Sequence, residues 1–306
     1  MLFSAIVTII GLSIFETVSS VDNAIINAEV LSTMSSRARR WFLTWGMIVA
    51  VFVVRGLLPF IIIWAFNPAL SVWQVLSATW SSNPLVLESI TKSAPILLIA
   101  GGVFLIFLFL HWLFLEDKKL GLPKTEKFFM SKGVWFYATV SVLLAVISWF
   151  ALRESSIMGF GAIVGSSLFF ITHGFKQNAE MEEKKLLNSV QSDLSKLLFL
   201  EIIDSTFSID GVLGAFAFTL SVPLILLGNG LGAFLVRKLT ISNIERIKKY
   251  IYLKNGAMYS ILVLGIIMLL RSFAWNVPEY VSPLTTVVII IFFFWKSKMS
   301  LANNVN

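Results

Sequence analysis

The sequence contains no cysteine among its 306 residues and only two histidines. The lack of cysteine excludes disulfide bonds, thiolate metal sites and thiol catalysis, although it does not identify a compartment. Charged residues are also scarce, at 13% of the chain, whereas a typical soluble domain has about 25%. A zinc-hydrolase motif of the form His-Glu-x-x-His is missing as well, so an intramembrane hydrolase is a remote alternative and we do not expect an enzyme.

Apolar residues, in contrast, are in excess, at 57% of the chain with 27 Phe and 10 Trp. Several apolar runs approach 20 residues, which is the length that an α-helix needs to cross a bilayer. We predict an all-α, multi-pass protein of the cell membrane, with a single transmembrane domain over residues 1–306 and no separate soluble domain. About nine membrane-spanning helices are expected, at residues 3–31, 41–66, 94–115, 134–151, 156–172, 197–220, 222–236, 256–271 and 282–295.

The distribution of basic residues predicts the orientation of these helices. Most of the 24 lysines and arginines lie in every second connection and in the C-terminal tail, and the opposite side has only Lys92, Arg153 and Arg271. By the positive-inside rule, the N-terminus is outside and the C-terminus is cytoplasmic. The net charge of +7 follows from this bias, so nucleic acid is not an expected partner, whereas the lipid bilayer is. No basic region precedes the first apolar run, which favours a retained first span over a cleaved signal peptide.

Acidic residues occur inside two of the apolar segments. A carboxylate at the centre of a membrane helix costs about 2.5–3.5 kcal/mol on insertion scales, and such residues are usually functional. The first segment contains Glu16-Thr-Val-Ser-Ser-Val-Asp22-Asn23-Ala, and the sixth contains Asp204-Ser-Thr-Phe-Ser208-Ile-Asp210-Gly211. The acid, serine and second acid of one motif align with those of the other. A pattern of acids that is costly to insert into a membrane therefore occurs twice.

The predicted orientation places the two motifs on oppositely directed helices. This is the signature of an inverted-topology repeat, in which a two-fold axis in the membrane plane relates two halves of a transporter. We expect the first repeat at about 1–115 and the second at about 197–295. A linker with two spans and a polar cytoplasmic stretch would occupy 116–196.

The motif side chains are all oxygen donors, which suits hard divalent cations such as Mg²⁺, Ca²⁺ or Mn²⁺. On a regular helix, Asp22 and Asp210 lie about 120° from the stripe that carries the first acid of each motif. Either the helices unwind there, as Gly211 and Gly214 favour in the sixth segment, or both sides face a wide polar cavity. The predicted metal-binding residues are Glu16, Asp22, Asn23, Asp204, Ser208 and Asp210.

Five further polar residues are candidates for supporting or relay roles, namely Ser20, Asn27, Glu201, Arg55 and Asn229. Alternatives remain open for several of them. Glu201 and Glu29 would also serve in hydrogen bonds between helices, Arg55 is either a counter-charge or a substrate ligand, and Asn229 is either a ligand at a helix break or a neighbour of packing glycines. The histidines, His111 and His173, lie near the inner ends of their spans, where we expect interfacial polar residues rather than a shared site.

At the two motifs the chain resembles the TerC-like integral membrane proteins of the LysE-type transporter superfamily. The resemblance rests on Glu16 with Ser20-Val-Asp22-Asn23-Ala24, and on Glu201-Ile-Ile-Asp204-Ser-Thr-Phe207-Ser-Ile-Asp210. Gly211-Val-Leu stands where many members have Ser-Ile-Pro, which indicates a divergent subgroup. The resemblance implies Mn²⁺ efflux, or a related role in supplying metal to exported proteins.

The function predicted from the sequence is therefore secondary export of a divalent cation, with manganese foremost. The metal is a substrate, and no prosthetic cofactor is expected. Four clustered carboxylates disfavour joint ionisation, so we expect protons to be exchanged for the metal. The alternative function is a non-transporting membrane partner that hands metal to other membrane or exported proteins, with 178–195 as its docking surface.

Overall fold

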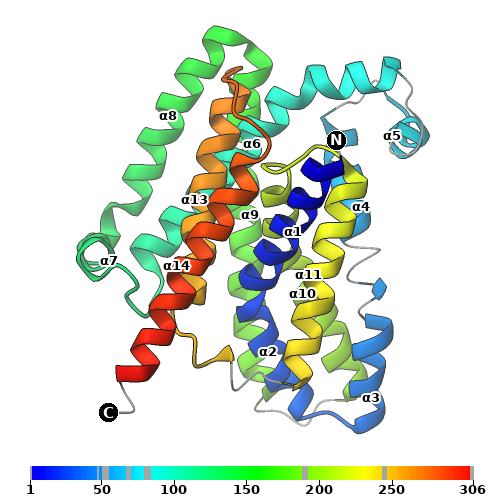
Figure 1. Cartoon of the computed structure of the whole chain (residues 1–306), viewed down its shortest axis with the longest axis vertical. Helices are drawn as coiled ribbons and strands as arrows, with labels where there is room; N and C mark the ends of the chain where they lie inside the picture. The colour runs from blue at the N-terminus through cyan, green and yellow to red at the C-terminus, as the bar shows by residue number, and fades with distance from the viewer. Residues whose placement is uncertain are drawn as a thin grey trace.

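The computed structural model is all-helical over the residues that it describes, which are 2–46, 48–49, 55–66, 70–78, 84–187, 192–242 and 247–303. Figure 1 shows the helices as a bundle, with most of the long ones running along the longest axis of the molecule. The elements are α1 (Leu2–Ser19), α2 (Val21–Ser32), α3 (Ser36–Trp41), the π-helix η1 (Phe42–Gly46), α4 (Arg55–Ala65), α5 (Val72–Ala78), α6 (Pro84–Leu115), α7 (Pro123–Met130), the 3₁₀-helix η3 (Gly133–Trp135), α8 (Phe136–Glu154), α9 (Ser156–Leu187), α10 (Asp193–Ala215), α11 (Val222–Ser242), α13 (Leu253–Ser272) and α14 (Val281–Asn303).

Six stretches in the described residues are long and apolar enough to cross a membrane, which makes this a multi-pass membrane protein. They are Leu2–Ser19, Thr91–Leu115, Gly133–Glu154, Ser156–Asn178, Leu253–Ser272 and Val281–Ala302. The predicted sixth and seventh spans correspond to helices α10 and α11, and the second span is described only in part. Two boundaries were wrong, because α6 begins at Pro84 and α9 continues to Leu187.

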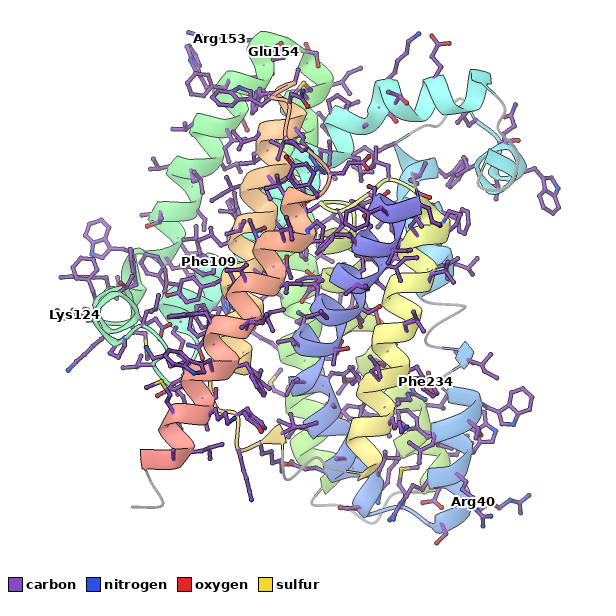
Figure 2. The ribbon with its side chains drawn as sticks, in the orientation of Figure 1. Arg40, Phe109, Lys124, Arg153, Glu154 and Phe234 are labelled. Carbon is purple, nitrogen blue, oxygen red and sulfur yellow. The ribbon has the colours of Figure 1, made fainter. Side chains whose placement is uncertain are left out.

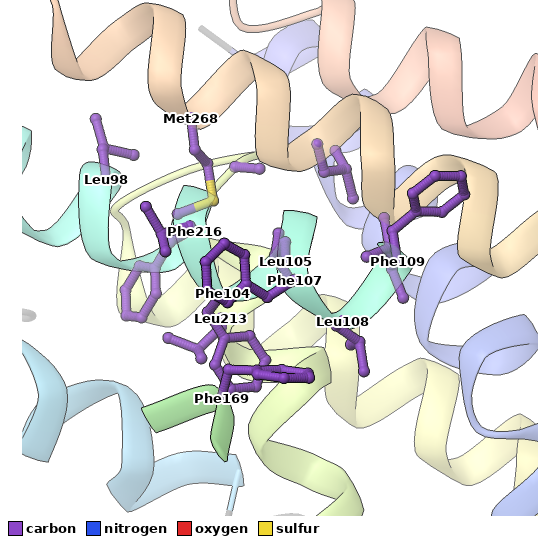
Figure 3. Packing of buried hydrophobic residues seen from close by; sticks show 14 of the residues in the cluster. Leu98, Phe104, Leu105, Phe107, Leu108, Phe109, Phe169, Leu213, Phe216 and Met268 are labelled. Carbon is purple, nitrogen blue, oxygen red and sulfur yellow. The ribbon is translucent and has the colours of Figure 1, made fainter. Parts of the chain in front are cut away.

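Helix α6 is the centre of the bundle. Within its membrane-spanning window, 89% of the residues are buried inside the protein, compared with 22% for α8 and for α14. A helix that is apolar on all sides is expected in such a position, whereas α8 and α14 have the large exposed side chains expected on a lipid-facing surface. Figure 3 shows the phenylalanines of α6 packed with Phe169 of α9. The ring centroid of Phe169 lies 6.2 Å from that of Phe104 and 5.8 Å from that of Phe107.

Small residues set the spacing between α6 and its neighbours. A Cβ atom on Gly102 would lie 3.0 Å from the carbonyl oxygen of Gly265 in α13, and a Cβ atom on Gly265 would lie 3.2 Å from the carbonyl oxygen of Gly102. Gly165 of α9 lies even closer to the backbone of Ala100 in α6. Inside a membrane, where burial away from lipid brings little gain, this close backbone contact is a main source of helix association.

The first span is interrupted at Ser20, between the end of α1 and the start of α2. The interruption is slight, because the Ser20 amide still bonds to the Glu16 carbonyl at 3.1 Å. In the sixth span the first of the two alternatives, unwinding, does not hold, since α10 is continuous through Gly211 and Gly214. The second of these glycines makes room for a ring instead, because a Cβ atom on it would lie 2.7 Å from Cε1 of Phe15.

Candidate cation-binding site

The acid motif of the first span packs against α10 and α11. Glu16 is buried, and Ser20, one turn later, donates a hydrogen bond from its hydroxyl to Glu16 Oε1 at 2.8 Å. A Cβ atom on Gly211 of α10 would lie 2.6 Å from Glu16 Oε2, and one on Gly232 of α11 would lie 2.6 Å from Glu16 Cβ. Two glycines on neighbouring helices therefore leave the space in which this carboxylate lies.

The first acid of the second motif, Asp204, is contacted by side chains from two other helices, α2 and α11. Asn23 of α2 donates from Nδ2 to Asp204 Oδ1 at 2.5 Å, and Arg237 Nη2 of α11 lies 3.9 Å from Oδ2. The arginine also donates to the Phe42 carbonyl and lies 4.2 Å from the centroid of that ring. Buried charges persist only where they are paired and hydrogen-bonded, and Asp204 meets both conditions. Ser208 donates to the backbone carbonyl of Asp204 at 2.5 Å, one turn earlier on the same helix.

The second acid of this motif faces another part of the molecule. Asp210 forms an ion pair with Lys176 of α9, in which 12% of the lysine side chain and 15% of the aspartate side chain are exposed. Both residues line a cavity of about 540 Å³. The cavity extends from the exposed Asp117, just beyond the end of α6, to Gly211 beside Glu16.

The histidines occupy the same cavity, so the prediction that they would not share a site was wrong. The ring centroids of His111 and His173 are 3.9 Å apart, and both rings line the cavity. Their spans run in the same direction and bring both rings to the same depth. Equal depth on two parallel helices was visible in the sequence, but the contact between α6 and α9 that brings the rings together was not.

A carboxylate at the cavity mouth connects α6 and α13. Glu116 lies 3.6 Å from His111 Nδ1 and 2.8 Å from Lys254 Nζ. Burial acts to raise the pKa of Glu116, but the His111 and Lys254 side chains outweigh it and lower the pKa to about 2. Lys118, nearby, has its pKa lowered, chiefly by burial. The mouth therefore carries a fixed negative charge beside a lysine.

The remaining predicted residues divide into three groups. Asn27 and Asn229 are buried, and neither amide oxygen has a hydrogen-bond partner in the described residues. Glu201 is half-buried against Gly46 of η1, which is close enough that a Cβ atom there would collide with its carboxylate. The side chains of Asp22 and Arg55 lie outside the residues that the structure describes.

Arg237 and Lys176 were not predicted as site residues. The sequence did carry a signal for the arginine, since Phe52-Val-Val-Arg55 in the second segment is repeated as Phe234-Leu-Val-Arg237 in the seventh. For Lys176 the signal was weaker: it follows His173 by one helical turn on the same span.

The structure thus pairs Glu16 with Ser20 and Asn23 with Asp204, while Ser208 bonds to the backbone of Asp204 and Asp210 faces the cavity. Within the described part of the chain, no three histidine or carboxylate side chains are gathered closely enough to hold a metal ion. What the arrangement offers is a set of buried oxygen donors at a helix interface, next to a cavity that reaches the protein surface.

These features define a class, a helical multi-pass membrane protein with a polar interface between its helices. The model of one family, described as "Protein of unknown function (DUF475)", matches residues 21–304, and the chain therefore belongs to this family. That match corrects the resemblance described above, because the chain is not assigned to the TerC-like family. No curated protein and no solved structure matches the chain.

Proposed function

We propose that this protein is a secondary transporter that carries a hard divalent cation across the membrane between two inverted repeats. The proposal rests on one observation, which is that the two copies of the acid motif contact each other. Asn23 of the first motif contacts the acid Asp204 of the second, and Gly211 of the second contacts the acid Glu16 of the first. Asn23 and Gly211 are corresponding positions of the two motifs, so the two contacts are equivalent.

A second pair of reciprocal contacts supports the inverted repeat. Gly102 of α6 lies against Gly265 and Leu269 of α13, and Gly265 lies against Gly102 and Ile106 of α6. Each glycine thus contacts the glycine of the other helix and the residue that follows that other glycine by four positions. An interface in which residue i meets j, and j meets i, is what a two-fold axis produces. With nine spans and the N-terminus outside, that axis would lie in the membrane plane.

The chemistry of the donors supports the choice of substrate. The motif offers carboxylate, amide and hydroxyl oxygens, which favour hard cations, and the chain has no thiolate for a soft metal. The preference for manganese depended on the corrected resemblance, so the proposal is for the class, which includes Mn²⁺, Ca²⁺ and Mg²⁺. Proton exchange remains the proposed coupling, because closely placed carboxylates disfavour joint ionisation.

Flux in reconstituted liposomes tests the proposal. Vesicles would contain an ion-sensitive dye, and Mn²⁺, Ca²⁺ and Mg²⁺ would be supplied in turn, with and without a pH gradient. We expect flux of at least one ion for the wild type, and a loss of at least tenfold for Asp22→Asn and Asp210→Asn, since each removes one charged oxygen ligand. Gly174→Ala is the matched control, because its Cβ atom would meet no atom within 4 Å.

The same experiment decides between the proposal and its alternative. Absence of flux for all three ions, from protein that remains folded, would overturn the transport function and leave the non-transporting partner. Flux that ignores the pH gradient would overturn the proton coupling alone.

A further inference from the structure

Lys176 pairs with Asp210, a carboxylate that binds the substrate cation in the proposed function. Its ammonium contacts Asp210 Oδ2, and the side chains of both residues are largely buried. The lysine comes from α9, which lies in the linker between the two proposed repeats. The pair therefore joins an element outside the repeats to a motif inside one of them.

We propose that Lys176 is an internal cation that competes with the substrate for Asp210. The inference rests on the proposed function and adds a step to it. An ammonium and a divalent cation cannot both occupy the same carboxylate oxygen, so an arriving ion displaces the lysine. In the empty protein the ammonium compensates a buried charge that would otherwise be costly.

The cavity gives the displaced ammonium a place to go. Lys176 and Asp210 share it with two further carboxylates, Glu116 and Asp117, which lie towards its mouth. With one other ammonium in the lining, that of Lys254, the cavity has more carboxylates than ammonium groups. A lysine released from Asp210 therefore enters a cavity of about 540 Å³ that is lined with acceptors, whereas a fully enclosed lysine would have no such exit.

The competition predicts that removal of the lysine tightens ion binding. Binding of radioactive Mn²⁺ to the purified full-length protein would be measured by equilibrium dialysis at pH 8. We expect Lys176→Met to bind Mn²⁺ about tenfold more tightly or better, because it removes the competing charge from a buried carboxylate. Lys176→Arg, which keeps the charge, should bind close to the wild-type affinity.

Lys254→Met is the matched control. Lys254 lines the same cavity and has the same charge, but its partner is Glu116 rather than Asp210. A general change in the potential of the cavity would tighten binding equally in both variants, whereas competition at Asp210 predicts a change of less than threefold for Lys254→Met. The double variant Lys176→Met with Asp210→Asn should lose the gain, and because it removes both charges it also reports whether the fold tolerates the neutral pair.

The outcomes separate this inference from the proposed function. If the wild type binds Mn²⁺ and Lys176→Met binds it equally well, or no better than Lys254→Met, the competition is overturned and the transport proposal stands. If neither the wild type nor Lys176→Met binds Mn²⁺, the competition is overturned, and the flux of Ca²⁺ and Mg²⁺ in the liposome assay decides whether the transport proposal falls with it. Binding that appears only in Lys176→Met supports the competition directly.

Discussion

Glu16 occupies its position because Gly211 has no side chain. A Cβ atom on Gly211 would lie 2.6 Å from Glu16 Oε2, so Gly211→Ala must displace the carboxylate. The obstructed atom is the far end of a flexible side chain, and the cost in folding free energy should therefore stay within about 1 kcal/mol. Transport, which depends on where the carboxylate lies, should fall at least tenfold in the liposome assay.

The thermal unfolding midpoint, measured on the same preparation, separates these two effects. Gly174→Ala serves again as the control, since it should leave transport unchanged and should not lower the unfolding midpoint. Wild-type flux from Gly211→Ala would mean that the position of Glu16 has no influence on transport. A large drop in the unfolding midpoint would mean that the glycine has a packing role instead.

The sequence identified most of the polar residues that meet at the helix interface, because each is expensive in an apolar segment and therefore conspicuous. Asn23 and Asp204 were predicted in this way and do contact each other, and Glu16 lies against Gly211 on the same helix as Asp204. The partners of these residues were harder to predict. Lys176 lies near the end of its span that the positive-inside rule assigns to the cytoplasm, where a lysine is common, and only the packing of α9 against α10 brings it to Asp210.

At the scale of elements, glycines decide how closely the helices approach. Gly165 of α9 lies against the backbone of Ala100 in α6, so Gly165→Ala has to push two helices apart. Overpacking of this kind typically costs 1–3 kcal/mol, and here the obstacle is backbone, which cannot rotate away. We expect the free energy of unfolding in detergent to fall by about 2 kcal/mol.

A control for this effect lies on the same helix. Gly174→Ala substitutes the same residue type on α9, where no atom lies within 4 Å, so it isolates helix propensity from packing. The alanine should stabilise α9 slightly there, by up to about 1 kcal/mol. Equal stability of the two variants would show that α6 and α9 can separate without cost.

Helix existence was predictable from apolar content, but helix interruptions were not. Glycine signals flexibility in a sequence, and on that basis Gly211 and Gly214 favoured unwinding of the sixth span, one of two alternatives. In the structure they serve the approach of Glu16 and Phe15, and α10 remains continuous. The same residue type favours both outcomes, and the choice depends on a neighbouring helix that is remote in sequence.

At the scale of the whole molecule, the charge bias and the helix order together define an orientation. Arg153 and Glu154 lie at one end of the bundle and Arg40 at the other, as Figure 2 shows. Because most basic residues belong to the connections on the side of Arg40, this is the side that the positive-inside rule assigns to the cytoplasm. Glu116 and Asp117 at the cavity mouth follow α6 into one of these lysine-rich connections, so the cavity would open towards the cytoplasm.

The lack of cysteine makes this orientation directly testable, since any introduced cysteine is the only thiol in the protein. Lys124 in α7 and Glu154 at the end of α8 are both exposed and lie on either side of the apolar stretch Gly133–Glu154. In intact spheroplasts of a bacterial expression host, a membrane-impermeant maleimide should label Glu154→Cys. It should label Lys124→Cys only after permeabilisation.

Labelling of Lys124→Cys alone in intact spheroplasts would reverse the orientation and turn the cavity outwards, so that Lys176 would be displaced by ions arriving from outside. Equal labelling of both would mean that α8 does not cross the membrane, which would remove the alternation on which the inverted repeat depends.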